Sequence, residues 1–201
     1  MLDGMNQSLM NPYDLIAQEF NSARTGFGEK EYVDLLLEQI SPSSRILDLG
    51  CGAGVPITAY LIERGHYVMG IDSSQAMLDL ARAQVPNADF ILGDMLSVEL
   101  DQSFNAIVGW DSVFHIEREK HSAVFRRCHS WLEPEGFLLV SLGGSDWEGW
   151  TEMYGKSFFY SGYEPDKSIA LIERSGFSVT SWEVDDPSSR GHIVVLARKG
   201  T

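Results

Sequence analysis

The stretch Arg45-Ile46-Leu47-Asp48-Leu49-Gly50-Cys51-Gly52-Ala53-Gly54 decides the fold of this chain. Its apolar first half predicts a buried strand, which passes a carboxylate and runs into a glycine-rich turn that opens a helix. Gly50, Gly52 and Gly54 let the backbone approach a ligand closely, because no Cβ stands in the way. The adjoining helix N-terminus favours polar or anionic groups. We therefore interpret this segment as part of a nucleotide- or nucleoside-binding site.

The spacing of the glycines narrows the choice of ligand. A dinucleotide fingerprint G-x-G-x-x-G that starts at Gly50 requires its third glycine at the position of Val55. The chain has Gly54 instead, and it thereby resembles the D-x-G-x-G-x-G turn of the class I S-adenosylmethionine-dependent methyltransferases. An unrelated glycine-rich strand–helix turn and an NAD-dependent oxidoreductase are the alternatives at this point.

The chain on both sides of this turn alternates between strand-like and helix-like segments. Short apolar runs predict strands at about 45–49, 67–71, 90–92, 106–108 and 137–142, with helices between them. Such alternation gives a parallel sheet with helices on both faces. Two last strands, at about 177–184 and 191–198, are joined by the turn-rich Asp185–Ser189 and are expected to pair antiparallel. We predict an α/β fold with a doubly wound, mostly parallel seven-stranded sheet and a C-terminal antiparallel hairpin.

The same closing hairpin is what the resemblance to the methyltransferases implies, and the resemblance covers about residues 40–198. We expect residues 1–201 to form a single methyltransferase domain. Two helical stretches within 1–43 would cover the cofactor site. The segment 143–165 is predicted as a long aromatic loop, inserted after the fifth strand as a lid.

The composition is that of an ordinary globular domain, with 44% hydrophobic and 22% charged residues. No apolar run approaches membrane-spanning length, and the N-terminus lacks the order of a signal peptide. Two cysteines, Cys51 and Cys128, form no disulfide framework and lack metal-ligand spacing. We expect a cytoplasmic protein without a metal site.

The net charge of −14 limits the possible partners, because 29 acidic residues outnumber 15 basic ones. A nucleic-acid-binding protein needs a basic surface that displaces counterions, and anionic membranes attract basic segments in the same way. Neither partner is expected for this chain. The predicted partner is a small-molecule substrate, and the protein would be a monomer or a homodimer.

The resemblance implies S-adenosylmethionine as the cofactor and S-adenosylhomocysteine as its product. Asp72 ends the second strand and would accept hydrogen bonds from the ribose, although such a carboxylate also serves NAD or a helix N-terminus. Asp94 would accept from the adenine amino group and Met95 would pack on the ring, unless Gly93–Met95 is an ordinary turn. The implied cofactor-binding residues are Asp48, Gly50, Cys51, Gly52, Gly54, Asp72, Ser73, Gly93, Asp94, Met95, Trp110 and Asp111.

Trp110 and Asp111 follow the fourth strand, beneath the methionine half of the cofactor in the resemblance. Trp110 packs either against the cofactor or in the core. The Asp111 carboxylate would offset the positive charge of the cofactor's sulfonium or amino group.

Methyl transfer from a sulfonium depends mainly on alignment and on the exclusion of water. A general base helps only where the nucleophile must lose a proton. His115 is the candidate base because it follows the fourth strand, and a structural histidine is the alternative. The aromatic segment predicts a pocket for an apolar or aromatic molecule, or plain packing onto the sheet. The candidate substrate-binding residues are Tyr13, His115, Trp147, Trp150, Tyr154, Tyr160 and His192.

These features together predict an S-adenosylmethionine-dependent methyltransferase that acts on a small molecule. A non-catalytic module that binds the same cofactor is the second interpretation, because the sequence contains no assured base. An NAD-dependent oxidoreductase is the third, and Val55 argues against it.

Overall fold

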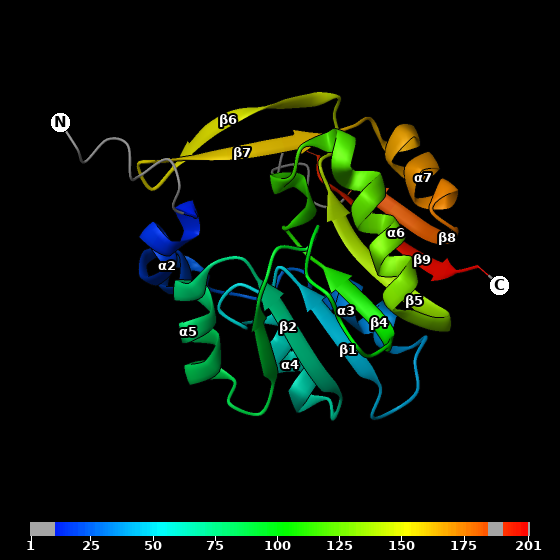
Figure 1. The fold of residues 1–201 in the computed structure, drawn as a ribbon, viewed down its shortest axis with the longest axis horizontal. Helices are drawn as coiled ribbons and strands as arrows, with labels where there is room; N and C mark the ends of the chain where they lie inside the picture. The colour runs from blue at the N-terminus through cyan, green and yellow to red at the C-terminus, as the bar shows by residue number, and fades with distance from the viewer. Residues whose placement is uncertain (1–10, 185–190, 201) are drawn as a thin grey trace.

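The computed structural model describes residues 11–184 and 191–200, and its centre is one seven-stranded sheet with the order β3-β2-β1-β4-β5-β9-β8 (Figure 1). The parallel strands are β1 (Arg45–Leu49), β2 (Tyr67–Asp72), β3 (Asp89–Leu92), β4 (Phe104–Gly109) and β5 (Leu132–Leu142). Strand β9 (Ile193–Lys199) pairs antiparallel with both β5 and β8 (Phe177–Val184). The predicted fold class is confirmed, whereas the predicted turn at Asp185–Ser189 and the N-terminal residues 1–10 lie outside the described residues.

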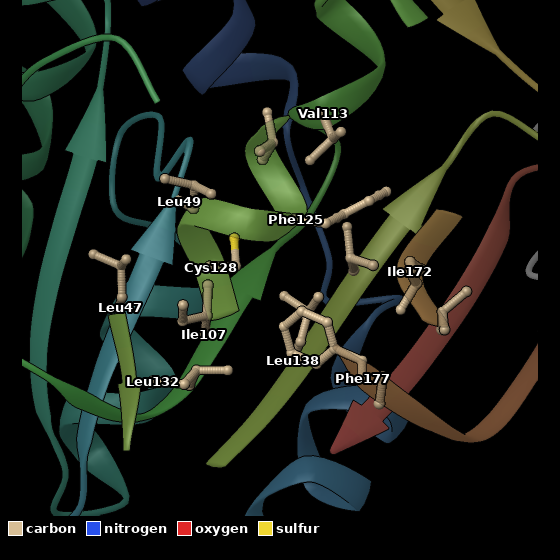
Figure 2. Packing of buried hydrophobic residues seen from close by; sticks show 14 of the residues in the cluster. Leu47, Leu49, Ile107, Val113, Phe125, Cys128, Leu132, Leu138, Ile172 and Phe177 are labelled. Atoms are coloured by element: carbon tan, nitrogen blue, oxygen red, sulfur yellow. The ribbon is translucent and has the colours of Figure 1, made fainter. Parts of the chain in front are cut away.

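Both faces of the central strands β1 and β4 are buried, which explains why their sequences are mostly apolar. In β1, Ile46 packs towards one helical layer, while Leu47 and Leu49 pack towards the other. The first layer contains α3 (Lys30–Leu37) and α4 (Ile57–Glu63), and the second contains α6 (His121–Trp131) and α7 (Pro165–Arg174). Figure 2 shows the second layer, where Phe125 and Cys128 of α6 lie against the sheet.

Two further helices, α2 (Pro12–Ala23) and α5 (Gln75–Gln84), lie side by side near the carboxyl ends of the first strands (Figure 1). Ala17 of α2 and Met77 of α5 share a small apolar cluster with Ala53 of the glycine turn. Helix α5 begins after Ser74, whose Oγ accepts a hydrogen bond from the Met77 N–H (3.1 Å). Among the described residues, no helix is both long and apolar enough to cross a membrane.

The aromatic segment after β5 forms a β-hairpin, so the prediction of a long loop was wrong. Strands β6 (Trp147–Met153) and β7 (Lys156–Gly162) pair antiparallel as a separate two-stranded sheet. Their aromatic side chains have high β propensity, which favours strands over an irregular loop. An isolated pair of strands is only marginally stable in water. This pair instead packs through β7 against α2 and against η2 (Val113–His115), a short 3₁₀ helix after β4.

The helix expected between the fourth and fifth strands is preceded by a short 3₁₀ stretch. Residues Arg118–Lys120 form a second 3₁₀ helix, η3, and the regular helix α6 starts at His121. The fifth strand is also longer than predicted, because it starts at Leu132 and includes a register shift opposite β4. The hydrophobic pattern located both elements but did not define where they begin.

Candidate functional site

A cavity of about 1040 Å³ lies at the carboxyl ends of β1, β2 and β4. The turn after β1 and the end of β2 form its floor, and the segments after β3 and β4 continue its wall. Helix α2 and the β6–β7 hairpin contribute the remaining sides. Open α/β sheets bind ligands at this edge, and the volume is in the range of small-molecule sites.

The glycine turn folds back onto β2 through its backbone. The N–H groups of Gly50 and Cys51 donate to the carbonyl oxygen of Ile71 at 2.8 and 3.0 Å. Gly50 and Gly52 have φ values of 83° and 53°, a left-handed conformation that strains other residues. At Gly50 and Gly52 the turn therefore exposes only backbone atoms to the cavity.

Gly54 differs from the other two glycines because it does not line the cavity. A Cβ at this position would lie 3.2 Å from Val85 and 3.3 Å from Ala81, at the end of α5. The prediction that Gly54 contacts the cofactor is therefore corrected. Its lack of a side chain instead allows α5 to pack closely against the turn.

Asp72 joins the end of β2 to the glycine turn. Its carboxylate accepts hydrogen bonds from the N–H of Gly52 (2.9 Å) and the N–H of Ser74 (2.8 Å). Burial raises the pKa of Asp72, and these backbone donors act in the opposite direction. Each carboxylate oxygen retains a second lone pair, so the group can accept further hydrogen bonds from a ligand.

Asp48 lies deeper beneath the turn, where its side chain is almost completely buried. One carboxylate oxygen accepts a hydrogen bond from the Thr58 hydroxyl of α4 at 2.5 Å. Burial raises the pKa of Asp48 to about 6, while Thr58 opposes the shift. The negative charge of Asp48 is therefore costly in this site.

The segment after β3 forms the rim of the cavity. Gly93, Asp94 and Met95 all line it, and Asp94 is exposed. The Asp94 side chain accepts a hydrogen bond from the Leu96 N–H (2.8 Å). This geometry is that of an ordinary Asx turn, and it also leaves carboxylate lone pairs that face the cavity edge.

Trp110 and Asp111 form the wall after β4. Trp110 is 8% exposed, packs in the core cluster with Val33 and also lines the cavity, so both roles weighed for it are compatible with its position. Asp111 has a φ of 47° and donates its N–H to the Ser141 hydroxyl (2.7 Å). Burial raises the pKa of the Asp111 carboxyl, and the Arg24 charge opposes this.

Helix α2 is fixed over the cavity by polar contacts with the start of α5. Asn11 donates from Nδ2 to the Ser73 hydroxyl (2.8 Å). Asp14 accepts from the Ser74 hydroxyl (2.6 Å) and from the Ala76 N–H (3.0 Å). An acidic side chain at a helix N-terminus is also favoured by the helix dipole.

We expect Asp14→Ala to lower the free energy of unfolding by about 1 kcal/mol, because it removes a charged acceptor from the α5 N-terminus. Urea denaturation followed by circular dichroism would measure the change. Glu19→Ala, at an exposed position of the same helix, is the matched control and should change stability by less than about 0.5 kcal/mol. Equal losses in the two variants would contradict the assigned contact.

The side chain of Tyr13 reaches from α2 to His115 of η2. Tyr13 Oη lies 2.8 Å from His115 Nε2, and His115 Nδ1 lies 2.8 Å from the carbonyl oxygen of Phe159 in β7. Because a carbonyl oxygen only accepts, Nδ1 carries the proton and Nε2 accepts from the Tyr13 hydroxyl. Burial lowers the pKa of His115 to about 4 and raises that of Tyr13, so both groups are neutral near pH 7.

His115 therefore has no free lone pair, which weakens its prediction as a general base. Its ring links α2, η2 and the hairpin, as the structural alternative for this residue requires. It nevertheless lines the cavity, together with the predicted substrate-binding residues Tyr13, Trp150, Tyr160 and His192. Tyr13 Oη retains a lone pair that can accept a hydrogen bond from a ligand.

Two aromatic residues predicted to bind substrate lie elsewhere. Trp147 begins β6 and Tyr154 occupies the hairpin turn, with a φ of 50°. Both side chains are exposed, and neither lines the cavity. These two predictions are corrected, because other residues of the hairpin, including Trp150 and Met153, line the cavity instead.

Several lining residues were missed as site candidates. Phe114 and Phe158 are buried aromatic residues beside His115, and Arg24 lies at the end of α2. Phe114 could have been predicted as a site residue, since it immediately precedes the candidate histidine. Arg24 belongs to a loop expected only to cover the site.

In a comparison with known protein families, residues 46–136 are similar to a family described as a methyltransferase domain. A phosphoethanolamine N-methyltransferase from Plasmodium falciparum is 26% identical over 121 residues, which make up 58% of this chain and 46% of that protein. A trans-aconitate 2-methyltransferase from Acidovorax ebreus is 35% identical over 133 residues, 62% of this chain and 47% of that protein. The chain thus spans about half the length of these curated relatives.

A solved structure of a Burkholderia thailandensis 1,6-didemethyltoxoflavin-N1-methyltransferase, with its substrate and S-adenosylhomocysteine bound, has the same fold. The TM-score is 0.72 at 19% identity, and the match covers 96% of this chain and 92% of that one. At this identity the comparison shows the fold.

Proposed function

We propose that the chain is a class I S-adenosylmethionine-dependent methyltransferase and that it transfers a methyl group from S-adenosylmethionine to a small-molecule acceptor. The observation that carries this proposal is the junction of Asp72 with the glycine turn. The Asp72 carboxylate lies 2.9 Å from the Gly52 nitrogen. The residue proposed to bind the ribose and the turn that lets the cofactor approach the backbone therefore line the same cavity.

The residues along the cavity fit an adenosine group. Gly50 and Gly52 leave room beside the turn, and Asp72 offers acceptors for two ribose hydroxyls. Asp94 and Met95 at the rim offer an acceptor for the adenine amino group and an apolar surface for its ring. We assign these positions to the nucleoside half of the cofactor.

The charges at the other end of the floor fit the amino-acid half. The Arg24 guanidinium is suited to a carboxylate, and Asp111 is suited to an ammonium or sulfonium group. When bound, the cofactor supplies an activated methyl group on a positively charged sulfur. A positive charge would be favourable here, because it would offset the cost that burial imposes on the negative charges of Asp48, Asp72 and Asp111.

The rest of the site would align the acceptor and exclude water. Helix α2 and the hairpin cover the cavity, and His115 joins them through its hydrogen bonds to Tyr13 of α2 and to the Phe159 carbonyl of β7. The Tyr13 hydroxyl donates to His115, so its oxygen can accept from the acceptor and fix its orientation. Alignment of this kind is a main source of rate enhancement in a displacement reaction.

Other features of the function stay predictions from the sequence. These are a cytoplasmic location, a monomer or homodimer without nucleic-acid or membrane partners, and the organisation of residues 1–201 as one domain. The covering role of the N-terminal helices and the hairpin is proposed on the geometry above.

Isothermal titration calorimetry with S-adenosylhomocysteine would test the cofactor assignment. We expect a Kd on the order of micromolar for the wild-type protein and a value about 10 to 100 times higher for Asp72→Ala, since hydrogen bonds to a charged group contribute roughly 1.5–3 kcal/mol. Asp79→Ala, at an exposed position of α5, is the matched control and should leave the Kd unchanged. Binding of NAD in place of S-adenosylhomocysteine, or equal heats for wild type and Asp72→Ala, would contradict the proposal.

A further inference from the structure

The part of the cavity beyond the proposed cofactor positions has aromatic walls. Phe114 of η2 stacks on Tyr160 of β7, with ring centroids 5.5 Å apart and an interplanar angle of 26°. The ring of His192 also packs against Phe114, with ring centroids 5.0 Å apart and an interplanar angle of 31°. Trp150 and Phe159 of the hairpin extend this surface outwards, with centroids 5.5 Å apart. Such walls favour flat rings, which make offset or edge-to-face contacts.

The charges along the cavity disfavour an anionic acceptor. Among the lining residues that the structure describes, two carry a basic lysine or arginine side chain, namely Arg24 and Lys120. Arg24 pairs with the buried Glu29 at 2.5 Å, and Lys120 pairs with Glu117 at 2.8 Å. Lys120 is thus matched by Glu117, and Arg24 is matched by Glu29 and assigned above to the carboxylate of the cofactor. An anionic acceptor would therefore bring a further, unmatched negative charge into the cavity.

Lys120 lies close enough to Asp94, at the proposed adenine end, for the two charges to interact. Its pKa is raised first by the hydrogen bond to Glu117, and the charge of Asp94 adds to the shift. The other charged residues that line the cavity are acidic, and one of them, Asp111, lies close enough to His192 for the two groups to interact electrostatically. Uncharged acceptors therefore fit this end of the cavity best.

His192 differs from His115 in the hydrogen bonds of its ring. Both nitrogens of His115 are engaged, by Tyr13 and by the Phe159 carbonyl. In the described part of the chain, the ring nitrogens of His192 have no hydrogen-bond partner, and the ring is half-buried at the cavity wall. An imidazole with a free lone pair can take a proton, and the nearby Asp111 carboxylate would stabilise the imidazolium.

We propose that the acceptor is an uncharged planar aromatic or heteroaromatic molecule whose nucleophile bears an O–H or N–H, and that His192 takes its proton. This inference rests on the proposed methyl transfer. It separates the chain from the two relatives above, since phosphoethanolamine and trans-aconitate, after which they are named, both carry anionic groups. His192, rather than His115, is then the catalytic base.

The step balances as a displacement. The lone pair of the acceptor oxygen or nitrogen forms the new bond to the methyl carbon. The electron pair of the broken carbon–sulfur bond stays on sulfur, which becomes a neutral thioether. The acceptor's proton passes to a ring nitrogen of His192 and from there to solvent.

Binding of two matched probes tests the acceptor class. 2-Naphthol and 2-naphthoate share one ring system, but only the second is anionic near pH 7, since a phenol has a pKa of about 10 and a carboxylic acid one of about 4. Calorimetry on the protein saturated with S-adenosylhomocysteine should give at least tenfold tighter binding for 2-naphthol. Equal or tighter binding of 2-naphthoate, of phosphoethanolamine or of trans-aconitate would overturn the proposal, and so would failure of 2-naphthol to bind.

Kinetics of His192→Asn test the assignment of the base. With 2-naphthol as acceptor, we expect kcat to fall by about 100-fold, the lower end of general-base contributions, while the Kd for 2-naphthol changes by less than about twofold. The deficit should shrink as the pH approaches about 10, where the phenol ionises without a base. His129→Asn, on α6 and outside the cavity lining, is the control and should retain full activity. A pH-independent deficit, or an unchanged kcat, would exclude His192 as the base.

The outcomes distinguish failure of the proposed methyl transfer from failure of the proposed acceptor class. A wild-type protein that fails to bind S-adenosylhomocysteine contradicts the proposed function and this inference together. A protein that binds S-adenosylhomocysteine but selects anionic acceptors contradicts only the acceptor class.

Discussion

Gly50→Ala is expected to lower the free energy of unfolding by roughly 3 kcal/mol or more, because two separate costs add at this position. The residue has a φ of 83°, which strains any side chain other than hydrogen. The new Cβ would also lie 2.3 Å from Ser112 Cβ. Ser112 cannot move away freely, since it is buried and donates a hydrogen bond to the Leu49 carbonyl (2.7 Å). Thermal and urea denaturation would measure the loss.

Gly65→Ala is the matched control for this prediction. Gly65 has a nearly identical φ of 86°, but a Cβ there would meet nothing within 4 Å. It should therefore show the strain alone, at about 1 kcal/mol. A loss at Gly50 no larger than that at Gly65 would show that Ser112 yields and that the turn does not require glycine for its packing.

Asp48→Asn is expected to flatten the dependence of stability on pH by about 2 kcal/mol between pH 4 and pH 6. In the folded wild-type protein burial raises the pKa of Asp48 to about 6, above its usual 3.8. The folded state then holds this proton more tightly than the unfolded state, so stability falls as the pH rises through this window and stays lower above it. Asparagine keeps an oxygen that accepts from the Thr58 hydroxyl, but it carries no charge.

The measurement compares urea denaturation of wild type and Asp48→Asn at pH 4, 5, 6 and 7.5. Other buried groups also titrate, and His115, whose pKa burial lowers to about 4, makes stability rise with pH. Such contributions cancel in the difference between the two proteins. Asp79→Asn, an exposed position, is the control and should follow the wild-type curve. Parallel curves for wild type and Asp48→Asn would contradict a buried, high-pKa Asp48.

The part of the site that follows the strands could be predicted from the sequence. Asp72 and Asp94 each end or follow a parallel strand, and the glycine turn follows another. Because parallel strands present their carboxyl ends at one edge, strand assignment alone brings these residues to a common cavity. Their positions need no knowledge of side-chain packing.

The acceptor side could not be predicted in the same way, because it depends on contacts between distant segments. Tyr13 and His115 are 102 residues apart, and only the docking of α2 brings them together. One ring nitrogen of His115 is hydrogen-bonded to the Phe159 carbonyl of β7, and the spacing of residues along the sequence does not indicate this contact. Trp147 and Tyr154 were misplaced for a related reason, since aromatic composition does not show which residues of a hairpin turn towards the site.

The position of β9 between β5 and β8 has a consequence for synthesis on the ribosome. A nascent chain that extends only through β8 leaves one edge of the 11-residue β5 open, because its partner there begins at Ile193. Unpaired strand edges recruit other chains, so stalled or truncated products are candidates for aggregation and for capture by chaperones. The ribosome must therefore synthesise β9 before the seven-stranded sheet can form completely. The fold is thus completed late in translation.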